Sequence, residues 1–142
     1  MKALSIQQPW AWAVVHAGKD IENRSWRTHH RGWVAIHSTA KPQREGSLPR
    51  GARRPRPNEI VRSAIIGVAY LTDVVERSRS KWFDGIAYGW VFEKPRRLRR
   101  PIPCKGRLGL WTLKPAVAAQ ITRQLGRLSE PTRANAGHAP SR

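Results

Sequence analysis

The sequence predicts an α+β fold, a small and partly closed β-barrel flanked by two or three helices. Several apolar runs rich in β-branched and aromatic residues have strand length, among them 33–38, 64–75 and 109–113. Two segments, 11–17 and 116–128, instead repeat their apolar residues at helical spacing. With 142 residues, 39% of them hydrophobic, the chain has material for one modest core and therefore for one domain. Short strands with few helices and basic connections fit such a barrel.

The first forty residues predict three strands and one helix. In order, these are a strand at 4–6, a helix at 11–17, a strand at 21–26 and a buried strand at 33–38. Pro9 suits the start of the helix, and Gly18 suits its end because glycine adopts positive φ without a steric penalty. Alternation along the second strand places Glu22, Arg24 and Trp26 on one side of it.

The remaining residues predict a basic loop, four strands and a C-terminal helix. In order, these are a loop at 41–62 with a short helix at 58–62, strands at 64–75 and 88–93, a strand at 97–102 that would pair with the one before it, a strand at 109–113, a helix at 116–128 and a disordered tail at 130–142. Gly67 would permit a bulge or close packing in the longest strand. In the last helix, Val117, Ile121, Leu125 and Leu128 repeat at four, four and three residues, which predicts one apolar face.

Charge is the strongest compositional signal. The chain has 27 Lys and Arg against 9 Asp and Glu, a formal net charge of +18, far more than solubility requires. Much of the excess lies at 49–57 and 96–100, so we expect an anionic partner. Arg99, Arg100 and Lys105 would follow the phosphate backbone of a nucleic acid, in a dense basic group that also contains Arg96, Arg97 and Arg107. Two alternatives are a solvated strand edge that discourages pairing between molecules and a genome rich in G and C, which favours Arg but does not explain the few acids.

Simple features argue against membrane, redox and metal functions. No run approaches the roughly 18 to 20 apolar residues of a membrane-spanning helix, and the N-terminus lacks a secretory signal, so we expect a cytoplasmic protein. Cys104 is the single cysteine, which leaves no intramolecular disulfide and no cysteine-based zinc site. No carboxylate or cysteine recurs at ligand spacing near His16, His29, His30 and His37, so no metal is expected. Glycine-rich phosphate loops and a nucleophile elbow are missing from the sequence, and no cofactor is expected.

The strongest candidate binding site in the sequence consists of Lys19, Glu22 and Arg24. Lys19 follows a helix-ending glycine, so its ammonium lies on a turn, and Glu22 and Arg24 project from one side of the next strand. The two cations can bind a phosphate or a base edge, while the carboxylate orients them and can accept a hydrogen bond from an exocyclic amine. From spacing alone, a surface ion-pair cluster worth about 1 kcal/mol or less is the favoured alternative.

Longer stretches around these residues resemble the ASCH domain, a family named for the homology region of a transcription coactivator. The stretches are LSIQQPWA at 4–11, GKDIENRSW at 18–26, RG at 31–32, GVAYLTD at 67–73, PIPCKG at 101–106 and LW at 110–111. The resemblance covers about residues 3–114 and is closest to the coactivator-like branch. The family signature, Gly-x-Lys-x-x-Glu-x-Arg, keeps its three charged residues here, although Ala17 stands at the first glycine position and Gly18 follows it.

The resemblance implies a PUA-like β-barrel, related to RNA-modification and RNA-binding domains, with a cleft around the signature. The ASCH domain would span residues 1–114 with the basic loop 41–62 as an insertion, followed by a helix at 115–129 and a tail at 130–142. The expected function is nucleic-acid recognition, of RNA rather than DNA and of a splayed or modified base. A transcription co-regulator module that binds DNA or protein is an alternative.

An enzyme acting in the same cleft is a second alternative. Some members of the wider family resemble amidohydrolases that remove an acetyl group from acetylated cytidine, and others resemble ribonucleases. In the amidohydrolases a threonine nucleophile lies three residues after the signature lysine and a glutamate lies on the central strand, and these positions hold Glu22 and Asp73 here. A carboxylate cannot replace the hydroxyl as an acyl acceptor, which weakens this hypothesis. The catalytic candidates that remain are Lys19, Glu22 and Asp73, with either carboxylate activating a water.

Aromatic and amide side chains would complete the site. Trp10 and Trp26 flank the signature and would form stacking walls, since nucleic-acid bases stack on flat side chains. Gln8 would add an amide, and Trp82 would close the cleft or cap the barrel. The tryptophans in apolar runs are predicted to be core residues: Trp12, Trp33, Trp90 and Trp111.

Overall fold

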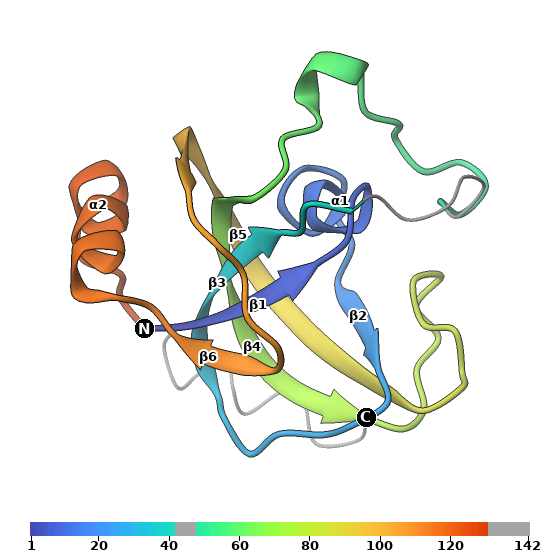
Figure 1. Cartoon of the computed structure of the whole chain (residues 1–142). Coiled ribbons are helices and arrows are strands. Elements are labelled where there is room, and N and C mark those ends of the chain that lie inside the picture. Colours follow the sequence, from blue (N-terminus) through green and yellow to red (C-terminus); the bar gives the residue numbers. More distant parts are fainter. Residues whose placement is uncertain (42–47, 131–142) are drawn as a thin grey trace.

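Six strands form one curled sheet, with two helices packed against it, in a computed structural model that describes residues 1–41 and 48–130 (Figure 1). The elements are, in chain order, β1 (Lys2–Ile6), α1 (Trp10–His16), β2 (Ile21–Arg24), β3 (Gly32–Ser38), a 3-10 helix (Pro57–Glu59), β4 (Ala64–Val75), β5 (Tyr88–Pro103), β6 (Leu110–Thr112) and α2 (Pro115–Leu125). The strand order is β2-β5-β4-β3-β1-β6, with β1 parallel to β3 and the other pairs antiparallel. The fold is α+β and the sheet is a half-barrel, as the sequence predicted.

The long strands β4 and β5 curl the sheet. Their register shifts three times along the pairing, and each shift bends and twists the strands locally. At the first shift, a Cβ on Gly67 would lie 2.6 Å from the carbonyl oxygen of Arg96 and 2.9 Å from a methyl group of Val15. A glycine is therefore needed where β4, β5 and α1 meet, which agrees with the close packing predicted at this position.

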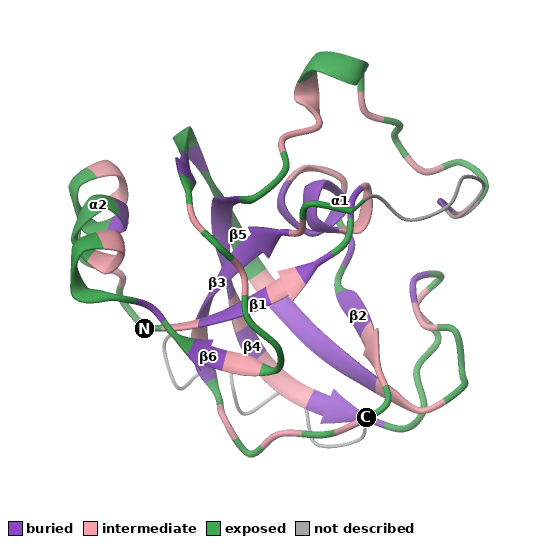
Figure 2. Ribbon diagram, in the orientation of Figure 1, coloured by how far each residue is buried: buried purple, intermediate pink, exposed green. Residues whose placement is uncertain are grey.

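Each face of the sheet has its own core, because neighbouring strand residues point to opposite sides. On β1, Leu4 packs in a cluster with Val14 of α1 and Trp90 of β5, whereas the adjacent Ala3 packs in a cluster with Trp111 and with Ile121 of α2. Figure 2 shows the buried residues concentrated in the central strands and in α1, with the outer half of β5 mostly exposed. No helix in the described part of the chain is long and apolar enough to cross a membrane.

The strands predicted at 88–93 and 97–102 are one strand, and the prediction that they pair with each other is wrong. Both halves of β5 pair with β4 instead. The twelve residues of β4 are enough to reach along most of the sixteen-residue β5, so one long β4–β5 hairpin replaces the predicted pairing of 88–93 with 97–102. Lys94 takes a positive φ of 51° between the two halves.

The C-terminal half of β5 leaves the regular ladder over 98–101, here called the β5 bulge. Gly67 pairs with Arg97 and Ile65 pairs with Ile102, so four residues of β5 stand opposite a single residue of β4. A bulge of this size projects from the sheet and leaves its backbone without strand partners. The β5 bulge carries Arg99 and Arg100, both exposed.

The C-terminal helix packs by the apolar face that the sequence predicted. Ile121 is fully buried, and Val117, Leu125 and Leu128 pack against the same cluster. The helix ends at Leu125 rather than at 128, because Gly126 adopts a φ of 72° that a continuing helix does not allow.

Other boundaries differ by a few residues. β2 ends at Arg24, before Trp26, and the short helix predicted at 58–62 is the 3-10 turn Pro57–Glu59. The Glu59 carboxylate accepts a hydrogen bond from the backbone N–H of Arg56, which closes that turn. Parts of the basic loop (42–47) and of the predicted tail (131–142) lie outside the described residues.

Candidate functional site

The charged signature residues line a pocket of about 650 Å³ between the end of β1 and β2. Two loops complete it, 81–84 and 107–109. The polar and aromatic side chains that line it are Ser5, Gln7, Trp10, Lys19, Glu22, Asn23, Arg24, Thr39, Lys81, Trp82, Phe83, Asp84 and Arg107. Its volume lies in the range of small-molecule sites, about 300 to 1,000 Å³.

A larger hollow, of about 980 Å³, lies where the C-terminal end of β4 and the loop 76–80 approach the start of β2. Arg27, Arg77 and Arg79 line it together with Asp20 and Glu76, and its lining contains no aromatic side chain. The smaller pocket therefore combines charge with aromatic surface, and the larger hollow does not.

Lys19 lies inside the protein, at the base of the pocket. Its side chain is 2% exposed, and its ammonium donates a hydrogen bond to the carbonyl oxygen of Ile21 and lies 3.4 Å from Glu22 Oε1. The indole rings of Trp10 and Trp82 flank it, with centroids 5.3 and 5.6 Å from Nζ. The two rings meet edge to face at 6.3 Å, so the ammonium is held between an ion pair and two aromatic rings.

Burial lowers the pKa of Lys19 from its ordinary value of 10.5 because desolvation disfavours the charged form, and the Glu22 carboxylate acts in the opposite direction. The ammonium of Lys19 was predicted to contact a ligand directly, but in the structure the protein already surrounds this cation. Lys19 therefore forms part of the base of the pocket.

Glu22 connects Lys19 to Arg24. Its Oε2 lies 3.1 Å from Arg24 Nη2, while its other oxygen faces Lys19. Arg24 Nη2 also donates to the carbonyl oxygen of Ser5 at 2.7 Å, which ties β2 to the end of β1. Both contacts use Nη2, and the Arg24 side chain is 21% exposed against 11% for Glu22. Of the two signature cations, Arg24 is the one that can reach a ligand.

Asn23 fixes the loop that forms the aromatic wall. Its side-chain amide donates to the carbonyl oxygen of Trp82 at 2.9 Å, and its amide oxygen accepts from the backbone N–H of Asp84 at 3.1 Å. Ser80 Oγ donates to Asp20 Oδ1 at 2.5 Å and anchors the same loop at an earlier position. Asn23 of β2 and Asp20 just before it thus hold Trp82 over Lys19.

Ser5, which lines the pocket, forms a hydrogen-bonded pair with His37. His37 is buried, and its Nε2 lies 2.7 Å from the carbonyl oxygen of Cys104, so Nε2 carries a hydrogen. Burial lowers the pKa of His37 below its ordinary value of 6.5, which favours the neutral ring with Nδ1 as an acceptor. Ser5 Oγ lies 3.1 Å from Nδ1 and 3.2 Å from the carbonyl oxygen of Arg107, two acceptors between which its single hydroxyl proton is shared. The pair therefore ties the 104–109 loop to the pocket.

Three predicted site residues lie outside the pocket lining. Gln8 is buried, and its amide is used within the protein: Oε1 accepts from the backbone N–H of Trp12 and Nε2 donates to the carbonyl oxygen of Val61, both at 2.8 Å. Trp26 packs edge to face on Trp90 with centroids 4.6 Å apart.

Asp73, the third of these residues, lies on β4 opposite Val91 and accepts a hydrogen bond from the backbone N–H of Val74 at 2.8 Å, with Arg31 3.9 Å away. The structure therefore brings Lys19 and Glu22 together without Asp73.

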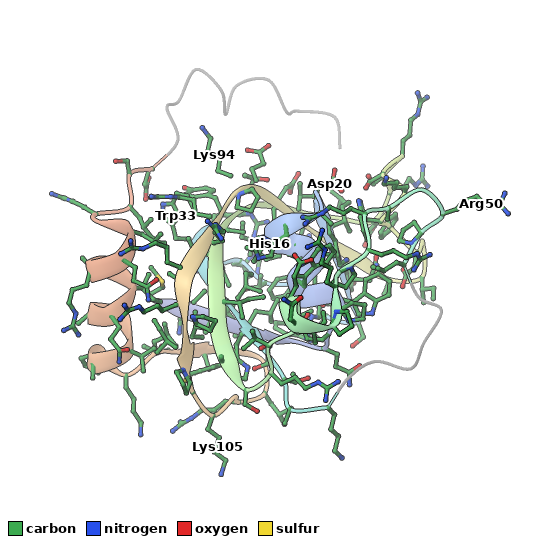
Figure 3. The ribbon with its side chains drawn as sticks, turned by 90° about the horizontal axis from the view of Figure 1, so that it is seen from above. His16, Asp20, Trp33, Arg50, Lys94 and Lys105 are labelled. Atoms are coloured by element: carbon green, nitrogen blue, oxygen red, sulfur yellow. The ribbon has the colours of Figure 1, made fainter. Side chains whose placement is uncertain are left out.

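The predicted backbone-contacting cations also lie elsewhere. Arg99 and Arg100 are on the β5 bulge, and Lys105 is exposed in the loop that follows β5. Figure 3 shows Lys105 and Lys94 projecting from opposite edges of the molecule and Arg50 projecting from a third side. Lys81 and Arg107 are the cations at the pocket rim, and of these Arg107 was expected to follow phosphates, whereas Lys81 was not singled out from the sequence.

Trp82, Asn23 and Phe83 are the pocket residues that sequence reasoning placed least well. Trp82 was predicted only to close the cleft or cap the barrel, and it does line the pocket while packing in a buried cluster with Trp12 and Val91. The polar string around it gives one usable signal, a tryptophan followed by phenylalanine in a segment that is otherwise hydrophilic.

Among the described residues, no group of three His, Cys, Asp or Glu side chains could hold a metal ion.

The curled sheet and the Lys-Glu-Arg pocket together define a PUA-like domain of the ASCH type. The ASCH domain family matches residues 4–101, so this chain belongs to that family. It is 31% identical over 126 residues to Activating signal cointegrator 1 of Homo sapiens and 29% identical to the protein of the same name in Mus musculus, with 78% of this chain matched in each case. The match spans 22% of the length of those two proteins.

Solved structures support the fold. The ASCH protein of Zymomonas mobilis has a TM-score of 0.54 and 16% identity to this chain, covering 86% of this chain and 93% of that one. A mutant form of the same protein has a TM-score of 0.53 and 17% identity, covering 86% and 96%. The likeness at this identity concerns the fold alone.

Proposed function

We propose that the pocket binds one nucleotide of a nucleic-acid strand, RNA in preference to DNA. The observation that carries the proposal is the juxtaposition of an ion-paired Arg24 and two indoles in edge-to-face contact, Trp10 and Trp82, in one pocket of nucleotide size. A guanidinium suits phosphate oxygens and base edges, and flat rings suit bases. The net charge of +18 supports a polyanionic ligand.

Each pocket residue has a distinct task in this proposal. Arg24 donates to the nucleotide while Glu22 holds the guanidinium in one orientation. Trp10, which is partly exposed, offers the stacking surface, and the buried Lys19 keeps the two indoles in place. Lys81 and Arg107, exposed at the rim, neutralise neighbouring phosphates.

A co-regulator module that binds duplex DNA is the second candidate. It is favoured by the similarity to Activating signal cointegrator 1, of which the matched region is 22%. Duplex DNA presents stacked bases, whereas a pocket of this kind accepts a base that has left the stack. The two candidates therefore differ in whether single strands bind more tightly than duplexes.

Hydrolysis in the pocket ranks behind binding. Lys19 Nζ and Glu22 Oε1 lie 3.4 Å apart, but the alternative base, Asp73, does not line the pocket. Incubation with acetylated cytidine and with labelled RNA tests this ranking. Turnover that Lys19→Ala abolishes would reverse it.

The test of the binding proposal compares Arg24→Ala with Arg54→Ala, an exposed arginine outside the pocket, so that both variants lose one positive charge. Fluorescence anisotropy with single-stranded RNA, duplex RNA, single-stranded DNA and duplex DNA across salt concentrations gives affinity and salt slope. We expect Arg24→Ala to weaken single-stranded RNA binding by about 10-fold or more, in line with roughly 1.5 to 3 kcal/mol for a charged hydrogen bond, and Arg54→Ala to weaken it far less. Equal losses of RNA affinity in the two variants would mean that diffuse surface charge, rather than the pocket, binds RNA.

A further inference from the structure

A third concave surface lies between the β5 bulge and α2. It has a volume of about 570 Å³ and is lined by Arg99, Arg100 and Arg123 together with Gln120 and Gln124. None of its lining residues lines the nucleotide pocket. We call this surface the arginine groove.

Gln124 fixes the groove by binding the backbone of the β5 bulge. Its amide oxygen accepts from the N–H of Arg100 at 3.1 Å, and its amide nitrogen donates to the carbonyl oxygen of Arg100 at 2.8 Å. The side chain thus replaces the strand partner that the bulged residue lacks. Ile121, on the same helix as Gln124, is fully buried in the core, so the helix that holds the β5 bulge is itself fixed to the core. Arg99 and Arg100 are therefore held in place at their backbone while their side chains stay exposed.

Charge in the groove has a single sign. Its lining contains three guanidinium groups and no carboxylate, and none of the ion pairs found among residues 1–41 and 48–130 involves Arg99, Arg100 or Arg123. Three cations gathered without counter-charges repel one another, a cost that an anionic ligand would relieve.

The exposed groups of the groove favour phosphate over an acidic peptide. Arg99, Arg100, Pro101, Gln120 and Arg123 are exposed, and the one large apolar side chain of the lining, Ile102, is buried. Protein partners depend on buried apolar or aromatic anchors, for which this lining offers no exposed large apolar side chain, whereas guanidinium and amide donors match the repeated oxygens of a phosphodiester backbone.

We infer that the arginine groove binds phosphates of the same nucleic-acid strand whose nucleotide enters the pocket, so that α2 contributes to ligand binding as well as to the core. The inference rests on the proposed function for its ligand, and the groove itself is a separate site. Strands too short to reach both sites should use the pocket alone.

The experiment measures binding of a 3-nucleotide and a 20-nucleotide single-stranded RNA to the full chain and to Arg123→Ala, with Arg127→Ala as the matched control. Arg127 is exposed just beyond α2 and does not line the groove, so both variants lose the same charge from the same region. We expect Arg123→Ala to weaken binding of the long strand by about 3- to 10-fold and to reduce the salt slope by about 1, with little effect on the short strand. Arg127→Ala should leave the long-strand affinity within about 2-fold.

A second variant tests the Gln124 contact without a change of charge. Gln124→Ala releases the β5 bulge, and we expect it to weaken long-strand binding by about 2- to 5-fold at an unchanged salt slope. Circular dichroism and the urea unfolding midpoint show whether α2 stays folded, and Arg123→Ala carries the test if it does not.

The outcomes separate the two sites. Loss of long-strand binding in Arg123→Ala with no effect of Arg24→Ala would keep the groove and reject the pocket. Equal behaviour of Arg123→Ala and Arg127→Ala would reject the groove while leaving the pocket test to stand by itself. Polyglutamate that competes with the long strand at equal charge concentration would also overturn the inference, because the groove would then select charge and not phosphate.

Discussion

At the scale of single residues, the site depends on one carboxylate shared by two cations. Glu22 lies 3.4 Å from Lys19 and 3.1 Å from Arg24, and its side chain is 11% exposed. A buried ion pair adds little net stability, but breaking one by removing the partner leaves a buried charge without compensation. The three residues are therefore unequal in their effect on folding.

This inequality predicts different costs for two substitutions. Glu22→Gln leaves Lys19, 2% exposed, without its counter-charge, and we expect a loss of about 3 kcal/mol or more in the free energy of unfolding. Lys19→Met removes the buried cation while Glu22 keeps Arg24, so we expect a change of about 1 kcal/mol or less. Urea denaturation measures both. Equal losses, or a larger loss for Lys19→Met, would contradict the shared-carboxylate account.

The His37 ring predicts a pH dependence of stability. Its pKa in the folded chain is lowered by burial from 6.5, so below about pH 6.5 the unfolded chain binds more protons than the folded chain does. Stability should therefore rise with pH through the window between the lowered pKa and 6.5, and be fully present above it. Burial, with Arg97 nearby, lowers the pKa of His16 in the same direction.

Unfolding free energies measured between pH 5 and 8 test the contribution of His37. In His37→Gln the slope in this range should decrease, because the group that binds the extra proton on unfolding is gone. His29→Gln, at an exposed histidine, is the control for the loss of an imidazole ring. A His37→Gln profile that parallels the wild type would contradict the prediction.

At the scale of elements, sequence periodicity predicts what is local and misses what long-range pairing decides. The alternation of 21–26 places Glu22 and Arg24 on one side, and the spacing of α2 predicts its buried face, as observed. The single β5 was not predictable, because its continuity comes from β4 and not from its own residues. The burial of Lys19 was missed for the same reason, since Trp82 reaches it from a distant loop.

Gly67 is the element-scale position with the clearest mutational consequence. A methyl group there would approach the carbonyl oxygen of Arg96 to 2.6 Å, and neither the β5 backbone nor the α1 side chain Val15 can withdraw without disturbing the core. We expect Gly67→Ala to lower the free energy of unfolding by about 1 to 3 kcal/mol, as overpacked core substitutions do. Unchanged urea denaturation would show that the contact between β4 and β5 is more compliant than the structure indicates.

At the scale of the whole molecule, the ASCH fold separates two kinds of charge. The signature residues pair within the pocket, whereas Arg99, Arg100 and Arg123 of the β5 bulge and α2 form no ion pair with a described residue, and no described carboxylate lines that surface. The net charge of +18 predicted a polyanionic partner but not where on the surface this partner binds, because that depends on which loops the half-barrel brings together. The pocket and the arginine groove are two places in the described part of the chain where polar groups gather, and they are the sites that we propose for nucleic acid.

The seven tryptophans permit the most direct test of the central proposal, that a nucleotide enters the pocket. In a titration of the ¹⁵N-labelled chain with single-stranded RNA, the indole N–H signals of Trp10 and Trp82 should shift and saturate with the binding isotherm. The signal of Trp90, whose ring is buried and whose Nε1 donates to the carbonyl oxygen of Trp26 at 3.0 Å, should stay unchanged. Saturating binding with no movement of the Trp10 and Trp82 signals would place the RNA elsewhere on the protein and contradict the account.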